Sequence, residues 1–326
     1  MDNVESKIFE CFDVPENPDL SVVYKFLPKS PNEAYYGERT DRNVGWITRE
    51  EQEILKKSTV GIAGCGGMGG ALAERLLRLG IGEIRVADCE SFDISNINRQ
   101  LAATRSTIGK NKALETARSL RRITDDSKIV VFHEGIAENT VRSFVSGCDI
   151  VCDEIEFYEL AAAIMLHKEA RAAGIPILGC NTVGFGTHLF LFTSQSMTIE
   201  DVFGMTQEEA EGVDQRRRSG MLSEKQFKDL IERLLLCVTP ELQEYCTDKQ
   251  NGNLKACRER LLNEEKAPIL STNPALATGF IADWTLLHLL RNSGVKRDIA
   301  KLPEMPGYLY LDAAKMQAKI VNGKWW

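Results

Sequence analysis

Four glycines form the first feature of this sequence that suggests a chemical use. They are Gly64, Gly66, Gly67 and Gly69. They separate an apolar run, residues 59–63, from a segment whose leucines recur at helical spacing. Glycine permits a tight turn there and lets phosphates approach backbone N–H groups at a helix start. Asp88 ends a second apolar run, residues 83–87, where a carboxylate can reach ribose hydroxyls. These residues predict a nucleotide site, and by themselves they would favour NAD or FAD.

The polar residues that follow Asp88 shift this prediction toward a triphosphate. Arg99 can bind two phosphate oxygens through its guanidinium, and Asn96 can orient one more. Lys112 falls in the first turn of the next predicted helix, above the same phosphates. A dehydrogenase needs no such basic pair after its ribose-binding acid. Arg99 and Lys112 could instead be ordinary solvated charges on the surface. Their position behind a glycine loop disfavours that interpretation. We therefore expect ATP.

The elements that must position these residues alternate between strand and helix. Strands are predicted at 59–63, 83–87, 128–132, 149–153 and 175–179, and helices at 110–122, 138–146 and 159–173. Such alternation indicates an α/β fold with a doubly wound, mostly parallel, Rossmann-like sheet. A further strand at 188–193 follows a glycine-containing stretch without helical period, and we expect it to be antiparallel and at the sheet edge.

Three regions are predicted along the chain. Residues 1–45 form a polar N-terminal arm in which only 20–26 is apolar enough for a strand. Residues 46–197 form the ATP-binding domain, which opens with a helix capped by Thr48 and Glu51. Residues 198–326 form a mostly helical region for substrate and dimer contacts. Its helices are predicted at 223–236, 254–262 and 274–290.

Composition excludes several classes of protein. The 326 residues carry a formal net charge of −7, which disfavours a nucleic-acid groove. No apolar run reaches the roughly 18 residues of a membrane span, and the N-terminus lacks a signal-peptide pattern. We therefore expect a cytoplasmic protein with no nucleic-acid or membrane partner. The basic run Arg216–Arg218 is expected to be a solvated face.

The nine cysteines indicate neither a disulfide framework nor a zinc site. Their number is odd, and no C-x-x-C pair occurs. A nucleophilic role would fall on Cys180, Cys237 or Cys246, but a reactive thiol needs exposure and an electropositive setting. We expect none of the three to be essential.

Residues 42–193 resemble the ThiF/MoeB/HesA family, the bacterial relatives of ubiquitin-activating enzymes. The glycine loop, Asp88, an N-x-x-R-Q signature and a G-x-x-K signature carry this resemblance. The signatures fall on Asn96, Arg99, Gln100, Gly109 and Lys112. The resemblance implies adenylation of a carboxylate on a peptide or small protein, with ATP and magnesium. It also implies that Arg99, Lys112 and Arg42 neutralise the reacting phosphates.

Arg42 resembles the family's arginine that enters the other subunit's ATP site. It lies before the first predicted strand, and the helix that begins at Thr48 leads directly into that strand. An arginine there is poorly placed to fold back onto its own glycine loop. We therefore expect a homodimer in which each Arg42 serves the partner's nucleotide.

The departures from the family pattern narrow the prediction. Magnesium would be bound by a D-x-x-D pattern, and here Asp153 is followed by Glu156 at the second position. Zinc-binding cysteine pairs are absent, and residues 192–236 contain no cysteine for a thioester. The chain therefore looks nearest to the zinc-free peptide-modifying members of microcin and pantocin type, which act in peptide-antibiotic biosynthesis.

Other functions stay open at this point. An activator of a ubiquitin-like sulfur-carrier protein would use the same chemistry. A tRNA-modifying enzyme is disfavoured by the net charge of −7. A nucleotide-binding pseudoenzyme is kept open by Glu156, and an NAD-binding module would leave Arg99 and Lys112 unexplained.

Overall fold

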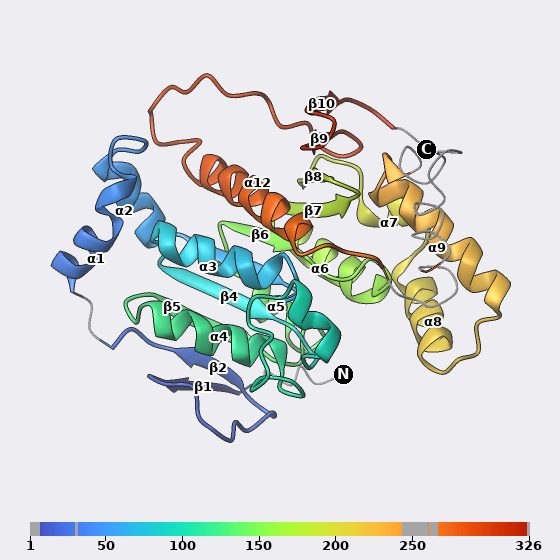
Figure 1. Ribbon diagram of the computed structural model, residues 1–326, viewed down its shortest axis with the longest axis horizontal. Helices are drawn as coiled ribbons and strands as arrows, with labels where there is room; N and C mark the ends of the chain where they lie inside the picture. The colour runs from blue at the N-terminus through green and yellow to red at the C-terminus, as the bar shows by residue number, and fades with distance from the viewer. Residues whose placement is uncertain (1–6, 30–31, 243–259, 261–266, 325–326) are drawn as a thin grey trace.

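A central parallel sheet organises the chain. A computed structural model describes residues 7–29, 32–242, 260 and 267–324. Its ten described strands form one sheet in the order β1-β2-β5-β4-β3-β6-β7-β8-β9-β10 (Figure 1). The parallel centre consists of β3 (Thr59–Ala63), β4 (Glu83–Ala87), β5 (Lys128–Phe132), β6 (Ile150–Asp153) and β7 (Ile177–Val183). The doubly wound, mostly parallel α/β fold is thus confirmed.

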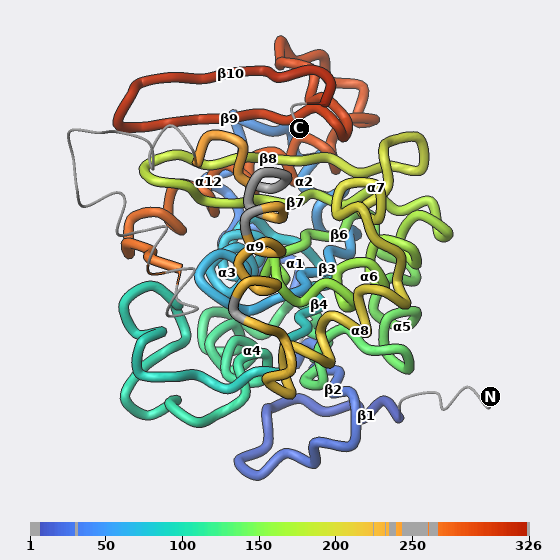
Figure 2. The backbone as a smooth tube through the Cα atoms, turned by 90° about the vertical axis from the view of Figure 1, so that its right-hand side faces the viewer, coloured from blue at the N-terminus to red at the C-terminus, as the bar shows by residue number. Residues whose placement is uncertain are grey.

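The C-terminal side of the sheet differs from the prediction. β8 (Gly186–Phe192) is antiparallel to β7, as expected. It is not an edge strand, because β9 (Tyr308–Asp312) pairs with it and β10 (Gln317–Val321) follows (Figure 2). The region predicted to be mostly helical therefore contains two strands as well as helices. The alternating tyrosines and leucines of β9 are buried against β8, and the resulting pairing is non-local.

The N-terminal arm also contributes to the sheet. β2 (Val23–Phe26) pairs antiparallel with β5, and β1 (Ile8–Cys11) pairs parallel with β2. Phe26 is fully buried and Tyr24 nearly so. Strands from all three predicted regions therefore lie in one sheet.

Helices cover both faces of the sheet. The face toward the viewer in Figure 1 carries α3 (Gly69–Leu79), α4 (Lys112–Ile123) and α12 (Thr272–Leu289). The opposite face carries α5 (Val141–Val145), α6 (Leu160–Ala173) and α7 (Ile199–Phe203), followed outward by α8 (Gln207–Arg218) and α9 (Glu224–Val238). Among the described helices, none combines the length and apolarity that crossing a membrane demands. Apart from residue 260, the predicted helix 254–262 lies outside the described residues, as do Cys246 and the side chain of Cys237.

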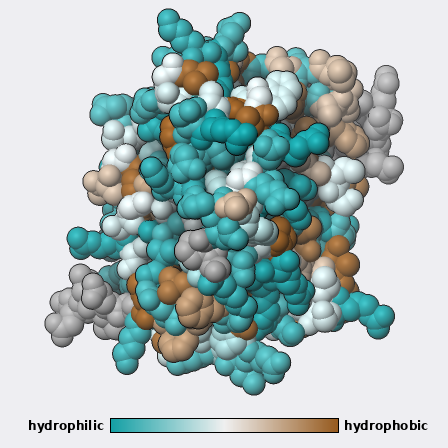
Figure 3. Space-filling view, turned by 90° about the vertical axis from the view of Figure 1, so that its left-hand side faces the viewer, coloured by the Kyte–Doolittle hydropathy of each residue, from teal (hydrophilic) through white to brown (hydrophobic). Residues whose placement is uncertain are grey.

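The amino end of the central strands is closed by α1 (Glu33–Thr40) and α2 (Arg49–Lys57). The predicted capping box of α2 is present, with Thr48 and Glu51 bonding to each other's backbone N–H groups. Glu51 is buried, and both of its oxygens accept from Arg297 at 2.6 Å. Figure 3 views the side of α1 and α2 and shows mostly hydrophilic side chains, with apolar side chains in small separate groups.

Candidate active site

The predicted site residues gather at the carboxyl ends of the parallel strands. β4 and β5 lie on one side of β3, and β6 and β7 lie on the other. The chain order therefore reverses between β3 and β6, and ligands of open α/β sheets bind in the crevice at such a point. The glycine loop follows β3 there, and the acidic segment from Asp153 to Glu156 follows β6.

Gly64 allows the glycine loop and the acidic loop to pack closely against each other. Its φ is +100°, a left-handed conformation that favours glycine. A Cβ at this position would lie only 2.2 Å from the backbone oxygen of Glu154. Any side chain at position 64 would therefore separate the glycine loop from the acidic loop.

The glycine loop ends at an open helix N-terminus. Gly69 begins α3, and a Cβ there would lie 1.9 Å from the Gly64 oxygen. No side chain caps α3, so its first N–H groups remain available to an anion such as phosphate. A Cβ at Gly67 would lie 3.2 Å from Cγ of Pro274 in α12 and 3.5 Å from Cγ of Arg99. The start of α12 and Arg99 therefore flank the loop.

Asp88 faces the glycine loop from the end of β4. Its Oδ2 accepts a hydrogen bond from the Cys65 N–H at 2.7 Å, and its Oδ1 accepts one from the Glu90 N–H at 2.8 Å. Burial raises the pKa of Asp88, and the charge of Lys112 acts in the opposite direction. Each carboxylate oxygen keeps a further lone pair, so the group can still accept from a ribose hydroxyl.

Lys112 is held at the site by a residue that the sequence analysis did not single out. Its buried side chain forms an ion pair with Glu90, with 2.5 Å between Nζ and Oε2. Asn111, also missed, caps α4 and donates to the backbone oxygens of Asp88 and His133, each at 3.0 Å. The predicted helix began at residue 110, inside which Asn111 lies, whereas asparagine is a preferred N-cap and could have placed the helix start at Lys112.

The N-x-x-R-Q residues form a short turn, Ile94–Asn98, beside the loop. Asn96 is buried, and its Oδ1 accepts from the Asp93 N–H at 3.0 Å, so this oxygen orders the turn. Half-buried Arg99 donates to Oδ1 of Asn98 at 3.1 Å. Gln100 is buried, and its Oε1 has no hydrogen-bond partner among the described residues. The contacts of Asn96, Arg99 and Gln100 with phosphate stay predictions.

Glu156 joins the acidic loop to the basic residues. Glu156 is exposed, and partial desolvation of its carboxyl group raises its pKa. Glu90 and Asp88 raise the pKa further, whereas Lys112 and Arg99 lower it. These four charges therefore lie within electrostatic range of Glu156. No hydrogen bond or ion pair engages the Glu156 carboxylate within the described part of the chain.

The Asp153 carboxylate forms hydrogen bonds within the protein, unlike that of Glu156 in the described residues. Its Oδ2 lies 2.8 Å from Nε2 of His167 in α6, and its Oδ1 accepts from the Ile155 N–H at 3.0 Å. Between the two acids, Glu154 was missed by the sequence analysis. Both of its carboxylate oxygens are buried without a partner among the described residues, and burial raises its pKa well above the ordinary value.

Glu156 fits a magnesium ion better than Asp153 does. Magnesium prefers carboxylate and phosphate oxygens, and Glu156 offers an uncommitted carboxylate at the site. No group of three or more metal-ligating side chains occurs in the described ranges. Phosphate oxygens would therefore have to complete the coordination.

Arg42 is the one predicted site residue that lies elsewhere. It is exposed on the turn that follows α1, next to Trp46, whose exposed fraction is 90%. The adjoining Asn43 donates to the Leu79 backbone oxygen at 3.1 Å, at the end of α3 remote from the glycine loop. The 11 residues of α3 span about 16 Å at 1.5 Å per residue, so Arg42 does not reach the glycine loop of its own chain.

The basic run at the end of α8 is exposed at Arg216 and Arg218, as expected, but not at Arg217. Arg217 and Arg218 both pair with Glu159, three residues beyond Glu156. Arg217 also lies over the ring of Tyr158 at 4.8 Å and is only 17% exposed. The expectation of a solvated face was wrong for Arg217 alone, because Glu159 and the Tyr158 ring meet it, whereas Arg218 stays 64% exposed.

Several known proteins resemble this chain in sequence. The model of the ThiF family matches residues 40–323. The tRNA threonylcarbamoyladenosine dehydratase of Bacillus subtilis (strain 168) is 35% identical over 138 residues, which cover 42% of this chain and 54% of that protein. The sulfur carrier protein ThiS adenylyltransferase of Escherichia coli (strain K12) is 26% identical over 147 residues, covering 45% of this chain and 58% of that protein. The chain thus spans about half the length of each relative.

One solved structure resembles nearly the whole chain. The E. coli MccB structure with ATP superposes with a TM-score of 0.59 over 92% of this chain and 75% of its own, at 16% identity. At this identity the likeness concerns the fold. It extends beyond the parallel core to the regions on both sides of it.

Proposed function

We propose that this chain, which belongs to the ThiF family, is an ATP-dependent adenylyltransferase that activates a carboxyl group on a peptide or small protein. The meeting of Lys112, Arg99 and Glu156 beside an uncapped helix N-terminus carries the proposal. Both cations lower the pKa of Glu156, which supports a shared site at the carboxyl ends of β3 and β6. A dehydrogenase has no use for two cations there.

In the proposed reaction, a carboxylate oxygen of the substrate attacks the α-phosphorus of ATP. The bond from that phosphorus to the bridging oxygen of pyrophosphate breaks, and pyrophosphate leaves. Negative charge grows on the phosphoryl oxygens and on the leaving group, where Lys112, Arg99 and the α3 N–H groups can bind it. Asp88 would hold the ribose. Magnesium bound by Glu156 would neutralise further phosphate charge.

For the substrate, we favour a ribosomal precursor peptide of a peptide antibiotic. Cys180 supports a route without a thioester, because it is buried and burial raises its pKa well above the ordinary value. A sulfur-carrier protein would need the same adenylation, so it is the second candidate. The location in the cytoplasm stays a prediction.

Exchange of labelled pyrophosphate into ATP tests the proposed reaction. Wild-type protein should catalyse it with short peptides that carry a free C-terminal carboxylate, and Lys112→Ala should not. If only a sulfur-carrier protein ending in Gly-Gly supports exchange, the second candidate is right. Protection against heating by ATP, with no exchange from either carboxylate, would indicate a pseudoenzyme. Protection by NAD alone would indicate a dinucleotide-binding module.

The position of Arg42 supports a homodimer with shared sites. Arg42 is exposed and lies beyond the far end of α3, so the proposed role needs a second copy of the chain. Two-fold symmetry would give each copy's Arg42 to the other's nucleotide by the same contact.

Mixing variants separates a shared site from a site within one chain. Heterodimers of Arg42→Ala with Lys112→Ala should regain about half of wild-type exchange, because one of the two sites becomes complete. Wild-type chains paired with the double variant should be inactive. Half activity in the second mixture and none in the first would refute the shared site.

A further inference from the structure

Gly179 is an unusual residue at its place in the sheet. It lies inside β7, paired with Asp153 of β6 on one side and with Phe190 of β8 on the other. Glycine inside a strand is destabilising relative to alanine, by roughly 0.5–1 kcal/mol. The backbone does not require glycine here, since a Cβ would meet only the Asp153 oxygen, at 3.8 Å. Glycine in a strand often marks a place where a ligand approaches.

The missing side chain opens a cavity between Asp153 and Phe190. We name it the Gly179 pocket. About 50 Å³ of it is available to the centres of water-sized atoms. Its polar lining consists of Asp153, Glu156 and Asn181. The rest is apolar and includes Phe190, Phe192, Ile199, Val202, Phe203 and Met305. The polar end therefore adjoins the nucleotide site, and the apolar end lies under α7.

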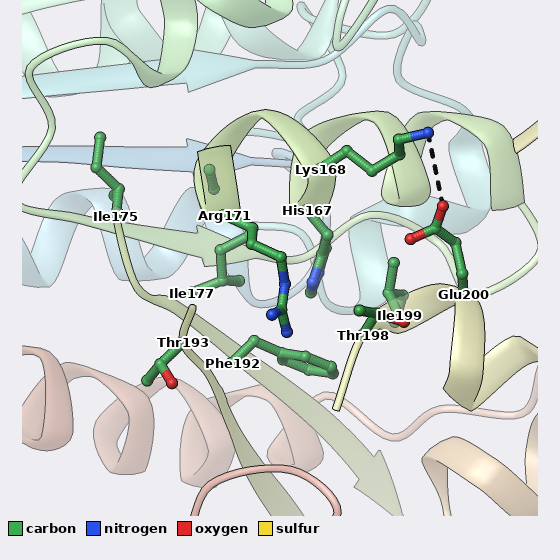
Figure 4. A pocket seen from close by; sticks show the side chains of 11 residues that line it. His167, Lys168, Arg171, Ile175, Ile177, Phe192, Thr193, Thr198, Ile199 and Glu200 are labelled. Carbon is green, nitrogen blue, oxygen red and sulfur yellow. Dashed lines mark ion pairs between the residues drawn. The ribbon is translucent and has the colours of Figure 1, made fainter. Parts of the chain in front are cut away.

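Beside the apolar end, α6 contacts both β8 and α7. A neighbouring hollow, which shares Phe192 and Ile199 with the Gly179 pocket, is drawn in Figure 4. His167 and Phe192 meet edge to face there, with 4.5 Å between ring centroids. Lys168 pairs with Glu200 at 3.6 Å (Figure 4). A ligand would therefore enter from the side of Glu156.

We infer that the Gly179 pocket binds the side chain of the residue whose carboxyl is adenylated, and that this side chain is a branched aliphatic one. The inference rests on the proposed function, because that function places the reacting carboxyl beside Glu156. A water molecule needs about 10–15 Å³ of such space, so the pocket holds roughly three to five water-sized groups. The four carbons of a leucine side chain fit this volume, and the seven of a phenylalanine exceed it.

Negative charge at the entrance of the Gly179 pocket also selects among substrate side chains. Asp153 and Glu156 would repel an acidic side chain, and the apolar interior offers such a group no cation. A glycine terminus would leave the cavity empty. The pocket thus favours valine, leucine or isoleucine over aspartate, phenylalanine and glycine.

Five peptides that differ only in their last residue test this selection. We would measure pyrophosphate exchange with Gly-Ala-Ser-Ala-X, where X is Gly, Val, Leu, Phe or Asp. One methylene group in an apolar pocket changes selection by roughly tenfold or more, so kcat/KM should rise at least that much from Gly to Leu. Exchange that is independent of X would overturn the inference and leave the proposed function standing.

Filling the pocket should reverse the preference. Gly179→Val places three carbons in the cavity, and we expect the Leu peptide to lose at least tenfold while the Gly peptide changes little. Gly179→Ala, which the 3.8 Å clearance accommodates, should give a smaller change in the same direction. Gly279→Ala is the matched control, because position 279 is exposed and nothing lies within 4 Å of its Cβ. An equal loss for every peptide in both Gly179 variants would contradict the inference.

A binding measurement keeps the pocket testable if no peptide supports exchange. Isovaleramide carries the leucine-like group without a carboxyl, so it cannot be adenylated. With ATP-loaded wild-type protein, we expect ligand-observed NMR to show saturation transfer to its methyl groups, and Gly179→Val should abolish the signal. Transfer without any exchange would reject the proposed function but retain the pocket. Absence of transfer to the wild type would reject the pocket.

Discussion

Tyr36 and Glu51, at the amino end of the central strands, have paired buried oxygens, whereas Glu154 and Gln100, at the carboxyl end, have buried oxygens without a partner in the described ranges. At the amino end, the Tyr36 hydroxyl donates to the Gly80 oxygen and accepts from Gln52, each at 2.8 Å. Glu51 accepts from Arg297 and Ser293 there. At the carboxyl end, Glu154 and Gln100 have buried oxygens with no partner in the described ranges.

The difference separates two uses of polar side chains. A buried group left without a hydrogen bond costs about 1–3 kcal/mol, so a protein retains it only where something else compensates. At the amino end, the compensation is the fold itself, because the bonds join α1, α2 and the chain after α12. At the carboxyl end, unpaired groups lie around the proposed nucleotide site. We therefore expect loss of a paired group at the first end to destabilise the protein, and substitutions at the second end to change activity or to remove the cost of an unpaired group.

Removal of the Arg99 guanidinium should give the largest effect on activity. Arg99→Ala is expected to lower pyrophosphate exchange by about 100-fold to 1000-fold, the usual cost of one lost donor to a charged transition state. Its melting temperature should match the wild type, because Arg99 bonds only within its own turn in the described structure. Near-normal exchange in this variant, with wild-type exchange established, would remove Arg99 from the mechanism.

Substitution of Glu51 should lower stability and leave activity nearly unchanged. Hydrogen bonds from Arg297 are the main reason why the pKa of Glu51 is lowered to about 2. A shift of this size corresponds to roughly 3 kcal/mol, so Glu51→Gln should destabilise the protein by about 2–3 kcal/mol at pH 7. The folded-state pKa is the lower one, so this stability is present above pH 4.5 and is lost as the pH falls toward 2.

Urea unfolding at several pH values measures this difference. The gap between wild type and Glu51→Gln should narrow as the pH falls below about 4.5. Glu50→Gln is the matched control, because Glu50 is an exposed neighbour on the same helix turn. Equal effects of the two substitutions at pH 7 would show that the buried ion pair adds no stability.

The same substitution at Glu154 should have the opposite sign. Burial raises the folded-state pKa of Glu154 well above 4.5, so stability is complete below pH 4.5 and is lost as the pH rises toward that pKa. Glu154→Gln removes this loss and should stabilise the protein at pH 8 by about 1 kcal/mol or more, with little change at pH 4. Thermal unfolding at both pH values checks this, and destabilisation at pH 8 would mean that the carboxylate has a stabilising partner.

Cys180 should give the smallest effect. Its thiol is buried, with Oγ1 of Thr187 at 3.1 Å, and burial keeps it protonated by raising its pKa. Cys180→Ala should therefore change exchange and product formation by less than about twofold, since only a thiolate is nucleophilic. Normal exchange with no final product would instead assign Cys180 to a thioester step.

Local patterns account for the parts of the structure that were predicted. The strands of the parallel centre are short apolar runs, and the Thr48–Glu51 cap needs only four consecutive residues. β9 was not predicted because its partner β8 lies in another part of the chain. Alternating Tyr308 and Tyr310 gave a local strand signal, but the non-local pairing decided its place.

The site residues also fall into those predicted from local sequence and those that depend on the fold. Lys112 and Arg99 were identified because the glycine loop and Asp88 precede them in sequence. The ion pair of Lys112 with Glu90, the engagement of Asp153 by His167 and the unpaired oxygens of Glu154 depend on three-dimensional neighbours. Position 179 was also overlooked, because a glycine in a strand is informative only when its neighbours across the sheet are known.

The adjacency of β8 and β9 has a consequence for loop-closure entropy. The chain leaves the sheet after β8 and re-enters it in β9, the neighbouring strand, so the β8–β9 ladder holds the two ends of this excursion together. Each doubling in the length of a flexible loop adds only about 0.6 kcal/mol to the cost of closing it. Insertions or deletions in the exposed parts of the excursion should therefore change the stability of the sheet little. The segment that carries α7, α8 and α9 can vary in length while the nucleotide-binding strands keep their places.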